Sequence, residues 1–249
     1  MNQDASRSED VLRSFQEFVS EGCGIELYDY QLQPAGAILD SIRLKQGLTI
    51  VLVFPSMSGK DELLAQLEVF LMRMLNDLKM RIVVVNCSDA NTLTAVMRLG
   101  DRLNSNVFTS YYREIVGMDF VLGEGRTTFY SMEAMTVGEP TQANLLLIVN
   151  EAQNISPNDF DQLNETLTSG RKVTRIICGS DYGCQSLLNR EIKRAIHDEQ
   201  KDGIKRLFKV TEAQARKENK PLDFTLSNID DLYGGHRATE LKKMLLGEE

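Results

Sequence analysis

Tryptophan is absent from the sequence, histidine occurs twice, and aromatic residues make up only 7% of the 249 positions. The four cysteines show no paired metal-ligand spacing, and the two histidines are isolated. We therefore expect buried free thiols in a reducing compartment and no metal site built from these residue types. The residues concerned are Cys23, Cys87, Cys178, Cys184, His197 and His236.

Long hydrophobic runs are also lacking. The longest are Leu48–Phe54, with seven residues, and Leu145–Asn150, whose six residues end in the polar asparagine. A membrane-spanning helix needs about 20 apolar residues, so neither run is long enough to cross a bilayer. The N-terminus, MNQDASRSEDVLRSF, is polar and acidic, which argues against a secretory signal. We therefore expect no membrane partner.

Basic residues are fewer than acidic ones, 28 against 36, which gives a net charge of −8. This balance argues against a broad nucleic-acid-binding surface but leaves a local basic patch open. The length of 249 residues and the hydrophobic content of 42% fit one large α/β domain or two small ones.

Strand-like and helix-like segments alternate along the chain, which is typical of a parallel sheet with crossover helices. We predict one doubly wound domain at 28–210, with a helical extension at 1–27 and another at 211–249. Strands are expected at 48–54, 81–86, 143–149, 173–178 and 205–210, and FVLGEGRTTFY (120–130) indicates a hairpin. Helices are expected at 8–21, 28–46, 60–78 and 185–200, with further helix starts at Ser88 or Asp89, at Ser156-Pro157 and at Thr211.

The stretch IVLVFPSMSGKDELLAQL combines a buried strand, a tight loop and an amphipathic helix. A phosphate-binding loop has this order, and its full pattern is G-x-x-x-x-G-K-[ST]. Gly59 and Lys60 match, whereas Phe54 replaces the first glycine and Asp61 replaces the hydroxyl residue. We predict phosphate binding by the loop and helix start, with Lys60 as the cation. The predicted nucleotide-binding residues here are Pro55, Ser56, Met57, Ser58, Gly59, Lys60, Asp61 and Glu62.

A second motif, LLLIVNEAQ, ends a buried strand in Asn150 and Glu151. The usual arrangement has Asp at the first position, to hold the Mg²⁺ shell, and Glu at the next, to polarise the attacking water. A third segment, RIICGSDYG, ends a strand in a turn with a small hydroxyl side chain. The three motifs together indicate a P-loop NTPase fold of the RecA/ASCE type, an α/β fold with a mostly parallel sheet between helices.

With these motifs in order, the sequence from Tyr28 to Phe208 resembles the ATPase domain of the large terminase subunit of tailed bacteriophages, a DNA-packaging motor. YDYQLQPAGAIL resembles the motif that contacts adenine, and the loop resembles the family's variant phosphate loop, which often lacks the first glycine. The resemblance implies binding of ATP or ADP with Mg²⁺, and it implies roles for individual residues. Tyr30 and Gln31 would contact the base, Lys60 the phosphates, and Glu151 would be the catalytic base; Gly179, Ser180 and Asp181 would couple hydrolysis to movement.

The sequence departs from the family at Ser56, where members commonly carry arginine, and at Asn150, where they carry aspartate. Without the loop arginine, hydrolysis needs an arginine from a neighbouring subunit; the candidates are Arg98, Arg102, Arg126 and Arg171. The chain ends about 40 residues after Lys209, so we expect no nuclease centre in it. Further implied features are double-stranded DNA, the portal and the small terminase subunit as partners, a homo-oligomeric ring, and the host cytoplasm as location.

Two questions stay open at this point. Asp61 is either a Mg²⁺ ligand, together with the shell around Asn150, or only a favourable acidic residue in the first turn of a helix. The protein itself is either a motor ATPase domain whose hydrolysis Asn150 weakens, or a terminase-derived regulatory or assembly module that does not hydrolyse ATP. A fragment of a DEAD-like helicase is a further alternative, because NEAQ and the upstream glutamine resemble that group too.

Overall fold

The apolar runs of the sequence form one eight-stranded sheet in the computed structural model, which describes residues 2–109, 112–115, 117–134, 140–180, 186–217 and 243–246. The strand order is β3-β4-β5-β2-β6-β7-β1-β8. The strands are β1 (Thr49–Val53), β2 (Arg81–Asn86), β3 (Arg113–Ile115), β4 (Asp119–Leu122), β5 (Gly125–Ser131), β6 (Leu146–Asn150), β7 (Thr174–Gly179) and β8 (Leu207–Lys209).

Six neighbouring strands, from β5 to β8 in the sheet order, are parallel, and β3 and β4 extend one edge in antiparallel pairing. The predicted hairpin is confirmed as β4 and β5, whereas β3 was not predicted. Strand β7 lies between β1 and β6, with Val53 opposite Gly179 and Val149 opposite Ile177. The carboxyl ends of these three strands therefore meet at one edge, where ligands bind in open α/β sheets.

Helices follow most of the parallel strands, as the alternating pattern predicts. They are α1 (Asn2–Cys23), α2 (Asp29–Arg43), α3 (Lys60–Met74), α4 (Asp89–Ser105), α5 (Pro157–Thr168), α6 (Leu187–Asp202) and α7 (Glu212–Lys217), with a 3₁₀ turn η1 (Ala152–Asn154). Ser88 caps α4 by accepting a hydrogen bond from the backbone N–H of Asn91 at 3.2 Å. Ser156 occupies the predicted cap position of α5 but makes no capping hydrogen bond there.

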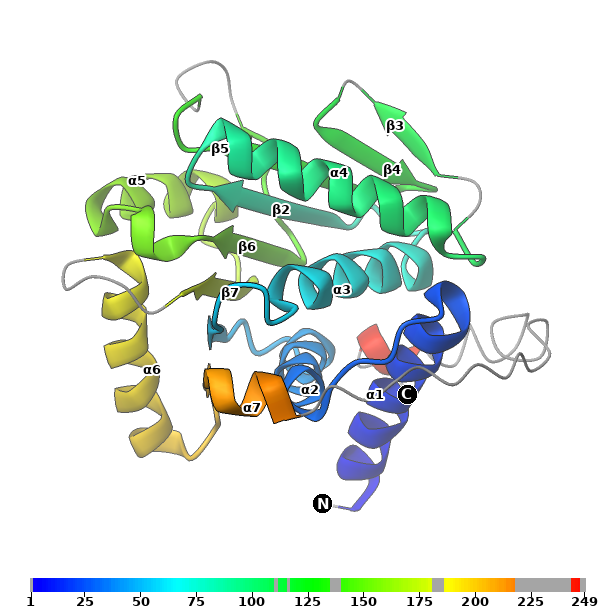
Figure 1. Cartoon of the computed structure of the whole chain (residues 1–249), viewed down its shortest axis with the longest axis horizontal. Helices are drawn as coiled ribbons and strands as arrows, with labels where there is room; N and C mark the ends of the chain where they lie inside the picture. Colours follow the sequence, from blue (N-terminus) through cyan, green and yellow to red (C-terminus); the bar gives the residue numbers. More distant parts are fainter. Residues whose placement is uncertain are drawn as a thin grey trace.

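The two faces of the sheet carry different helices. Alternate strand residues such as Ile50, Leu52 and Ile148 pack with α1, α2, α3 and α4, whereas Val51 and Val149 pack with α5 and α6. Both faces are thus covered, which explains why the strands read as continuous apolar runs rather than as alternating ones. Figure 1 shows α3 and α4 lying side by side, with α6 and α1 at opposite sides of the molecule.

The helix predicted within residues 1–27 is longer than expected and packs into the main core. Phe15 and Phe18 of α1 are fully buried, and both rings pack edge-on against Phe70 of α3, with centroids 5.2 and 5.4 Å apart. Beyond α7 the structure describes only 243–246, a helical turn in which Leu245 is buried in the same core. The remaining predictions for 211–249 lie outside the described residues.

The cysteines differ in part from the expectation. Cys178 is a buried free thiol, as predicted, whereas Cys23 and Cys87 are free but only half-buried. Both half-buried thiols lie where a chain segment leaves the core, Cys23 at the last residue of α1 and Cys87 just after β2. Cys184 lies outside the described residues.

Candidate functional site

The loop between β1 and α3 is held at both of its ends. At its start, the buried Phe54 donates its backbone N–H to the carbonyl of Gly179 on β7, at 3.1 Å. At its end, Gly59 has a φ of 81°, a left-handed conformation that favours glycine, and α3 begins at the next residue. Between them Met57 also has a positive φ of 62°, and its side chain is fully exposed. The loop therefore turns sharply from strand to helix, which aims the first N–H groups of α3 out of the sheet edge.

Tyr30 and Gln31, predicted to contact adenine, hold the backbone of this loop. The Tyr30 hydroxyl donates to the carbonyl of Ser58 at 2.9 Å, and the Gln31 Nε2 donates to the carbonyl of Gly59 at 2.8 Å. The Gln31 Oε1 accepts the backbone N–H of Tyr28 at 2.9 Å. Both side chains are buried, and these bonds use both ends of the glutamine amide. In this structure they brace the phosphate loop, and contact with a base stays a prediction.

Lys60 is the centre of the site. Its side chain is buried, and its Nζ donates to the Asn150 Oδ1 at 2.7 Å and forms an ion pair with Glu151. The Asp61 Oδ1 lies 3.4 Å from the same Nζ. The structure thus brings together the predicted lysine of the loop and the two predicted residues at the end of β6, which are 90 and 91 positions away.

The charge of Lys60 is stabilised by its neighbours. Burial lowers the pKa of this amine, but Cys178, Asp61 and Glu151 raise it by more, so that it lies above its ordinary value. Burial also raises the pKa of the Cys178 thiol to about 12, so this sulfur is neutral near pH 7 and the two carboxylates carry the effect. Lys60 is therefore a fixed positive charge at the sheet edge.

Asn150 presents its two amide atoms to different kinds of partner. Its Oδ1 accepts from Lys60, from the backbone N–H of Glu151 at 3.0 Å and from the Cys178 thiol at 3.3 Å. Its Nδ2 donates to the Asp61 Oδ1 at 3.4 Å and to the Asn86 Oδ1 at 3.3 Å. An amide satisfies all of these contacts at once, which a carboxylate in the same orientation would not.

Asp61 points into the site rather than along its own helix. One carboxylate oxygen faces Lys60 and Asn150, and the other forms an ion pair with the Arg98 Nη1 at 3.0 Å. Burial raises the pKa of this carboxyl, but Lys60 and Arg98 outweigh burial, so the pKa lies below its ordinary value. Asp61 is therefore an anion beside the lysine of the loop. Glu62, the other predicted acidic residue of the first turn, points away and pairs with Arg102 at 2.8 Å.

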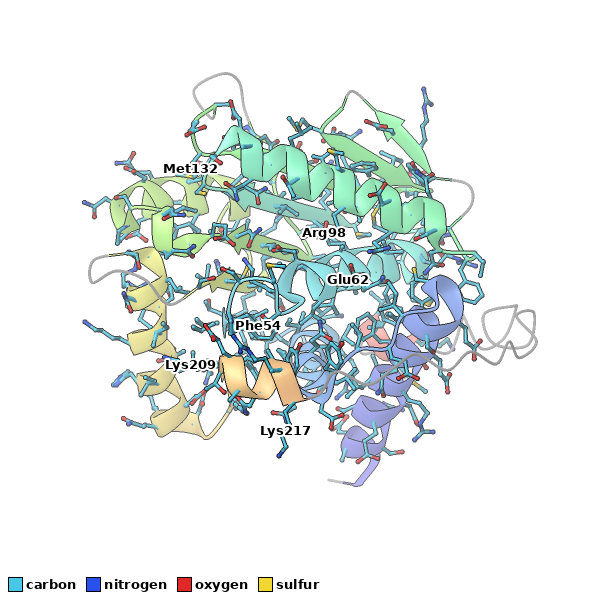
Figure 2. All side chains as sticks on the ribbon, viewed as in Figure 1. Phe54, Glu62, Arg98, Met132, Lys209 and Lys217 are labelled. Atoms are coloured by element: carbon cyan, nitrogen blue, oxygen red, sulfur yellow. The ribbon has the colours of Figure 1, made fainter. Side chains whose placement is uncertain are left out.

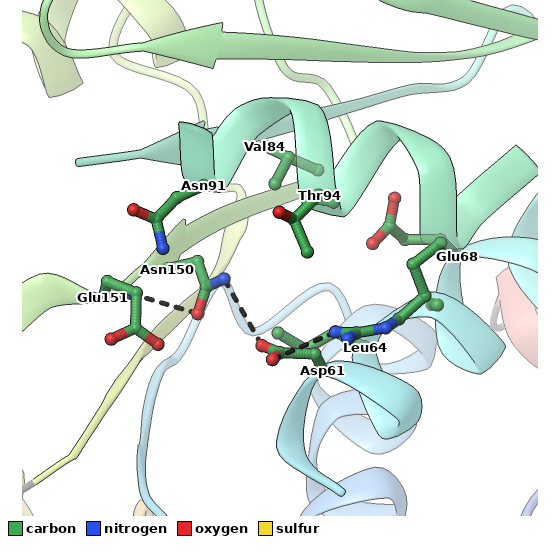
Figure 3. A pocket seen from close by; sticks show the side chains of 11 residues that line it. Asp61, Leu64, Glu68, Val84, Asn91, Thr94, Asn150 and Glu151 are labelled. Atoms are coloured by element: carbon green, nitrogen blue, oxygen red, sulfur yellow. Dashed lines mark hydrogen bonds and ion pairs between the residues drawn. The ribbon is translucent and has the colours of Figure 1, made fainter. Parts of the chain in front are cut away.

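A small pocket with a volume of about 60 Å³ opens between α3, α4 and the ends of β2 and β6. Figure 3 shows Asn150 between Glu151 and Asp61, with Asn91 and Thr94 on the α4 side. The other lining residues are Leu64, Ala65, Glu68, Val84, Ala95 and Arg98. The pocket is thus continuous with the predicted catalytic residues, and its walls carry both acidic and basic groups.

Glu151 has an unusual backbone conformation. Its φ of 54° and ψ of 41° lie in the left-handed region, which is uncommon for a residue with a side chain. Such strained positions cluster at functional sites because the surrounding structure must hold them. Here the turn directs the carboxylate back towards Lys60.

A chain of hydrogen bonds connects Glu151 with the predicted coupling segment. The Gln153 Nε2 donates to the Glu151 Oε2 at 2.5 Å, and its Oε1 accepts the backbone N–H of Ser180 at 3.2 Å. The Ser180 hydroxyl donates to the carbonyl of Phe54 at 3.2 Å. Gly179 makes room for this path, since a Cβ there would lie 2.0 Å from the Gln153 Oε1. Asp181, the third predicted coupling residue, lies outside the described residues.

The structure adds residues that the sequence did not single out: Asn86, Gln153 and the buried Glu68. Asn86 could have been predicted from the sequence, because it ends a buried strand as Asn150 does. Glu68 could not, because its place depends on how α3 packs against α4. Arg98 was predicted only as a candidate arginine from a neighbouring subunit, whereas the structure places it beside Asp61 of its own chain. Among the other predicted arginines, Arg102 pairs with Glu62, Arg126 with Asp119 at 3.5 Å, and Arg171 is exposed before β7.

The oxygen atoms around Lys60 fit a divalent cation of the Mg²⁺ type. Carboxylate and amide oxygens from Asp61, Asn150 and Glu151 already converge on one cationic group, and Mg²⁺ is commonly held by one or two carboxylates together with substrate phosphates. Within the described parts of the chain, no group of three or more His, Cys, Asp or Glu side chains is placed to hold a metal on its own. In the same residues, no helix is both long and apolar enough to cross a bilayer.

The sequence has no match among protein-family models or among curated proteins. Solved structures do match. The large terminase of bacteriophage HK97 superposes with a TM-score of 0.66 at 16% identity, over 95% of this chain and 51% of that one. The large terminase of a thermophilic bacteriophage matches with a TM-score of 0.56 at 10% identity, over 80% and 49% of the two chains.

A second structure of this thermophilic phage terminase, described as a complex with ADP, matches with a TM-score of 0.51 at 12% identity, over 78% of this chain and 48% of that one. The chain spans about half the length of the terminases it matches. The predicted fold class and the predicted resemblance are confirmed. This chain has the α/β fold of the part, about half, of a bacteriophage large terminase that it matches.

Proposed function

We propose that this chain is a nucleotide-binding motor ATPase module of the terminase type, which binds Mg²⁺ and ATP at the edge formed by β1, β6 and β7. The observation that carries the proposal is the convergence of Lys60, at a strand-to-helix turn, with Asn150 and Glu151 from a strand 90 positions later. Such a loop lysine and a strand-end glutamate are the two halves of an ATPase site. The description of the thermophilic phage terminase as an ADP complex supports the choice of ligand.

In this proposal Lys60 exchanges partners when the nucleotide binds. It gives up Asn150 and Glu151 for phosphate oxygens, which offer stronger, charge-assisted hydrogen bonds. Glu151 is then free to accept a proton from the attacking water, while Gln153 holds its second oxygen in place. Asp61 and Asn150 would hold Mg²⁺, which would supply positive charge to offset that of the phosphates. The inward direction of Asp61 favours this role over that of a simple helix cap.

A second candidate is a regulatory or assembly module that binds nucleotide without hydrolysing it. Asn150 favours this alternative, because a neutral amide lacks the charge with which a carboxylate holds the metal shell. The two candidates share the binding site and differ only in turnover. The terminase likeness supports double-stranded DNA, the portal, the small terminase subunit and a ring of further copies as partners in either case. We propose these partners on the likeness alone.

The test is titration calorimetry with ATP and ADP, with and without Mg²⁺. Lys60→Ala removes a charge-assisted hydrogen bond worth roughly 1.5–3 kcal/mol, so we expect affinity to fall by about tenfold or more. Lys193→Ala, which removes an exposed lysine of α6, is the control and should bind as the unmutated protein does. Absence of any nucleotide binding by the unmutated protein would refute the proposal.

Turnover assays then separate the two candidates. The motor ATPase should release phosphate from ATP, and Glu151→Gln should abolish the release while keeping or tightening ATP binding, because the variant weakens the competing ion pair with Lys60. A protein that binds ATP but releases no phosphate, alone or with DNA, is the non-hydrolysing module.

A further inference from the structure

Arg98 is brought to the site by the packing of α4 against α3. Its Nη1 lies 3.0 Å from the Asp61 Oδ2, and its side chain lines the same pocket as Asn150 and Glu151. Figure 2 labels Arg98 on α4 and Glu62 on α3, the two helices that pack against each other. The side chain is 33% exposed, so it has room to change its direction.

The charges around the pocket are balanced in this structure. Two cations, Lys60 and Arg98, are shared between two carboxylates, those of Asp61 and Glu151. Asp61 accepts from both cations, one on each of its oxygens. A triphosphate brings additional negative charge, and Asp61 would repel it unless a cation lay between them. A binding site with this aspartate therefore needs positive charge beyond Lys60.

We propose that Arg98 contacts the terminal phosphate of ATP, and that it does so in the same subunit as the phosphate loop. This inference rests on the proposed function. Arginine suits the role because its planar fork of N–H donors matches phosphate oxygens and keeps its charge. On nucleotide binding Arg98 exchanges the Asp61 carboxylate for phosphate, as Lys60 exchanges Glu151. An arginine placed in cis serves this purpose in one class of nucleotide hydrolases.

The terminal phosphate is favoured over the others by the position of Glu151. A catalytic base must lie beside the phosphate that is attacked, and Arg98 and Glu151 line the same pocket. In this proposal the phosphates nearer the nucleoside lie against the loop and the start of α3, where Lys60 and backbone N–H groups donate hydrogen bonds to them. Arg98 should therefore distinguish ATP from ADP.

The chain supplies a matched control on the same helix. Arg102 lies one turn further along α4, is 29% exposed, and pairs with Glu62 of α3, which does not line the pocket. Arg98→Ala and Arg102→Ala each remove one partly exposed α3–α4 ion pair. They differ in whether the arginine lines the nucleotide pocket.

The experiment measures ATP and ADP affinity of the unmutated protein, Arg98→Ala, Arg98→Lys and Arg102→Ala by calorimetry in Mg²⁺. We expect Arg98→Ala to weaken ATP by about tenfold or more and ADP by less than about threefold, since only ATP has the contacted phosphate. Arg98→Lys should recover part of the loss in ATP affinity, and Arg102→Ala should change neither ligand. Equal losses for ATP and ADP, no loss, or the same selective loss in Arg102→Ala would overturn the proposal.

A second set of variants, made in the Asp61→Ser protein, tests whether Arg98 contacts phosphate or only neutralises the charge of the Asp61 carboxylate. In Asp61→Ser the arginine has no carboxylate to neutralise, so a purely compensating Arg98 would become dispensable. We expect Arg98→Ala to weaken ATP selectively in this background too, and loss of that effect would overturn the proposal. If the unmutated protein binds neither nucleotide, the proposed function fails as well; if it binds both and Arg98→Ala has no effect, only the inference about Arg98 fails.

Discussion

The side-chain oxygen of Asn150 accepts hydrogen bonds, and its side-chain nitrogen donates them. If aspartate replaced it, a carboxylate oxygen would stand where Nδ2 now donates to Asp61 at 3.4 Å and to Asn86 at 3.3 Å. Two like charges about 4 Å apart cost roughly 4 kcal/mol at an effective dielectric of 20. Asn86 can compensate for the lost hydrogen bond, because its own Nδ2 is buried and has no hydrogen-bond partner among the described residues. A rotated Asn86 amide would offer that nitrogen to the new carboxylate.

We expect Asn150→Asp to make the protein depend on metal. Without Mg²⁺ the variant should be less stable than the unmutated protein by about 1–3 kcal/mol, because two carboxylates then face each other unneutralised. With Mg²⁺ and ADP the deficit should shrink, and ATP turnover should rise above that of the unmutated protein. Thermal unfolding in chelator and in Mg²⁺-ADP, with a phosphate-release assay, measures both effects. Asn158→Asp, in the exposed first turn of α5, is the control. Equal stability in chelator together with unchanged turnover would contradict this account of Asn150.

Glu68 is a buried carboxyl of α3 whose Oε2 has no partner among the described residues. Burial raises its pKa from an ordinary 4.5 to about 8, so the side chain is mostly protonated near neutral pH. The folded state keeps this proton up to about pH 8, whereas the unfolded chain loses it near pH 4.5. Unfolding therefore releases a proton between these two values, and the stability contributed by this group falls as the pH rises through that window.

Glu68→Gln should remove this pH dependence. Near pH 5 the variant and the unmutated protein should have similar free energies of unfolding, because both carry a neutral side chain. Near pH 9 the variant should be more stable by an amount on the order of a few kcal/mol, since it has no buried carboxylate to ionise. Urea denaturation at the two pH values measures the difference. Glu9→Gln, on an exposed position of α1, should follow the unmutated protein at both. A Glu68→Gln protein that is no more stable at pH 9 would show that Glu68 ionises without penalty.

Strands β6 and β7 are joined at their carboxyl ends through side chains as well as through the backbone ladder. Gln153 bridges Glu151, after β6, and Ser180, after β7, while Ser180 also bonds the carbonyl of Phe54 after β1. A shift of any one of these strand ends therefore changes the hydrogen bonds of the other two. This geometry gives the predicted coupling segment a physical connection to the glutamate.

We expect Gln153→Leu to lower turnover and to leave nucleotide affinity nearly unchanged. The substitution removes a hydrogen bond to the Glu151 carboxylate, and bonds to charged groups are worth about 1.5–3 kcal/mol, so kcat should fall by about tenfold or more. Affinity should change by less than about threefold, because Gln153 does not contact Lys60 or the loop. Steady-state kinetics and calorimetry measure the two quantities, with the exposed Gln162→Ala of α5 as control. A drop in affinity that matches the drop in kcat would indicate that Gln153 supports the whole site rather than the glutamate.

The sequence predicted elements that depend on local pattern and missed contacts that depend on packing between elements. The strands β1, β2, β6 and β7 were predictable because both faces of a parallel sheet are buried, which leaves continuous apolar runs. Strand β3 was not, because it has three residues at an antiparallel edge. The order of the motifs predicted that Lys60 and Glu151 belong to one site, although it did not predict their ion pair. The ion pair of Arg98 with Asp61 could not be predicted, because it depends on how α4 is positioned against α3. The hydrogen bonds of Gln153 could not be predicted either, because they depend on the space that Gly179 leaves by having no Cβ.

The molecule as a whole has a buried cluster on each face of its sheet, and the larger one lies on the face that α1, α2, α3 and α4 cover. Helix α1 takes part in this core through Val11, Phe15, Phe18 and Val19, which are between 0% and 1% exposed. Phe70, the common partner of Phe15 and Phe18, lies on the helix that starts at Lys60. Helix α1 therefore packs against the helix that begins at the predicted phosphate loop, and we infer that α1 unfolds with the sheet rather than ahead of it.

Phe15→Ala tests this inference over the whole molecule. A buried phenylalanine replaced by alanine typically costs about 3–5 kcal/mol, because the lost burial and the remaining cavity both destabilise the fold. If α1 belongs to one cooperative unit, the variant should lose that amount in global unfolding, and hydrogen exchange should become faster in β1, β6 and β7 as well as in α1. If α1 is instead an appendage, exchange should rise only within α1 while the protection of the strands stays unchanged. Hydrogen–deuterium exchange followed by mass spectrometry resolves these segments, and Gln16→Ala, at the adjacent exposed position, controls for the change in helix sequence. Unchanged protection of the strands in Phe15→Ala would refute the single cooperative unit.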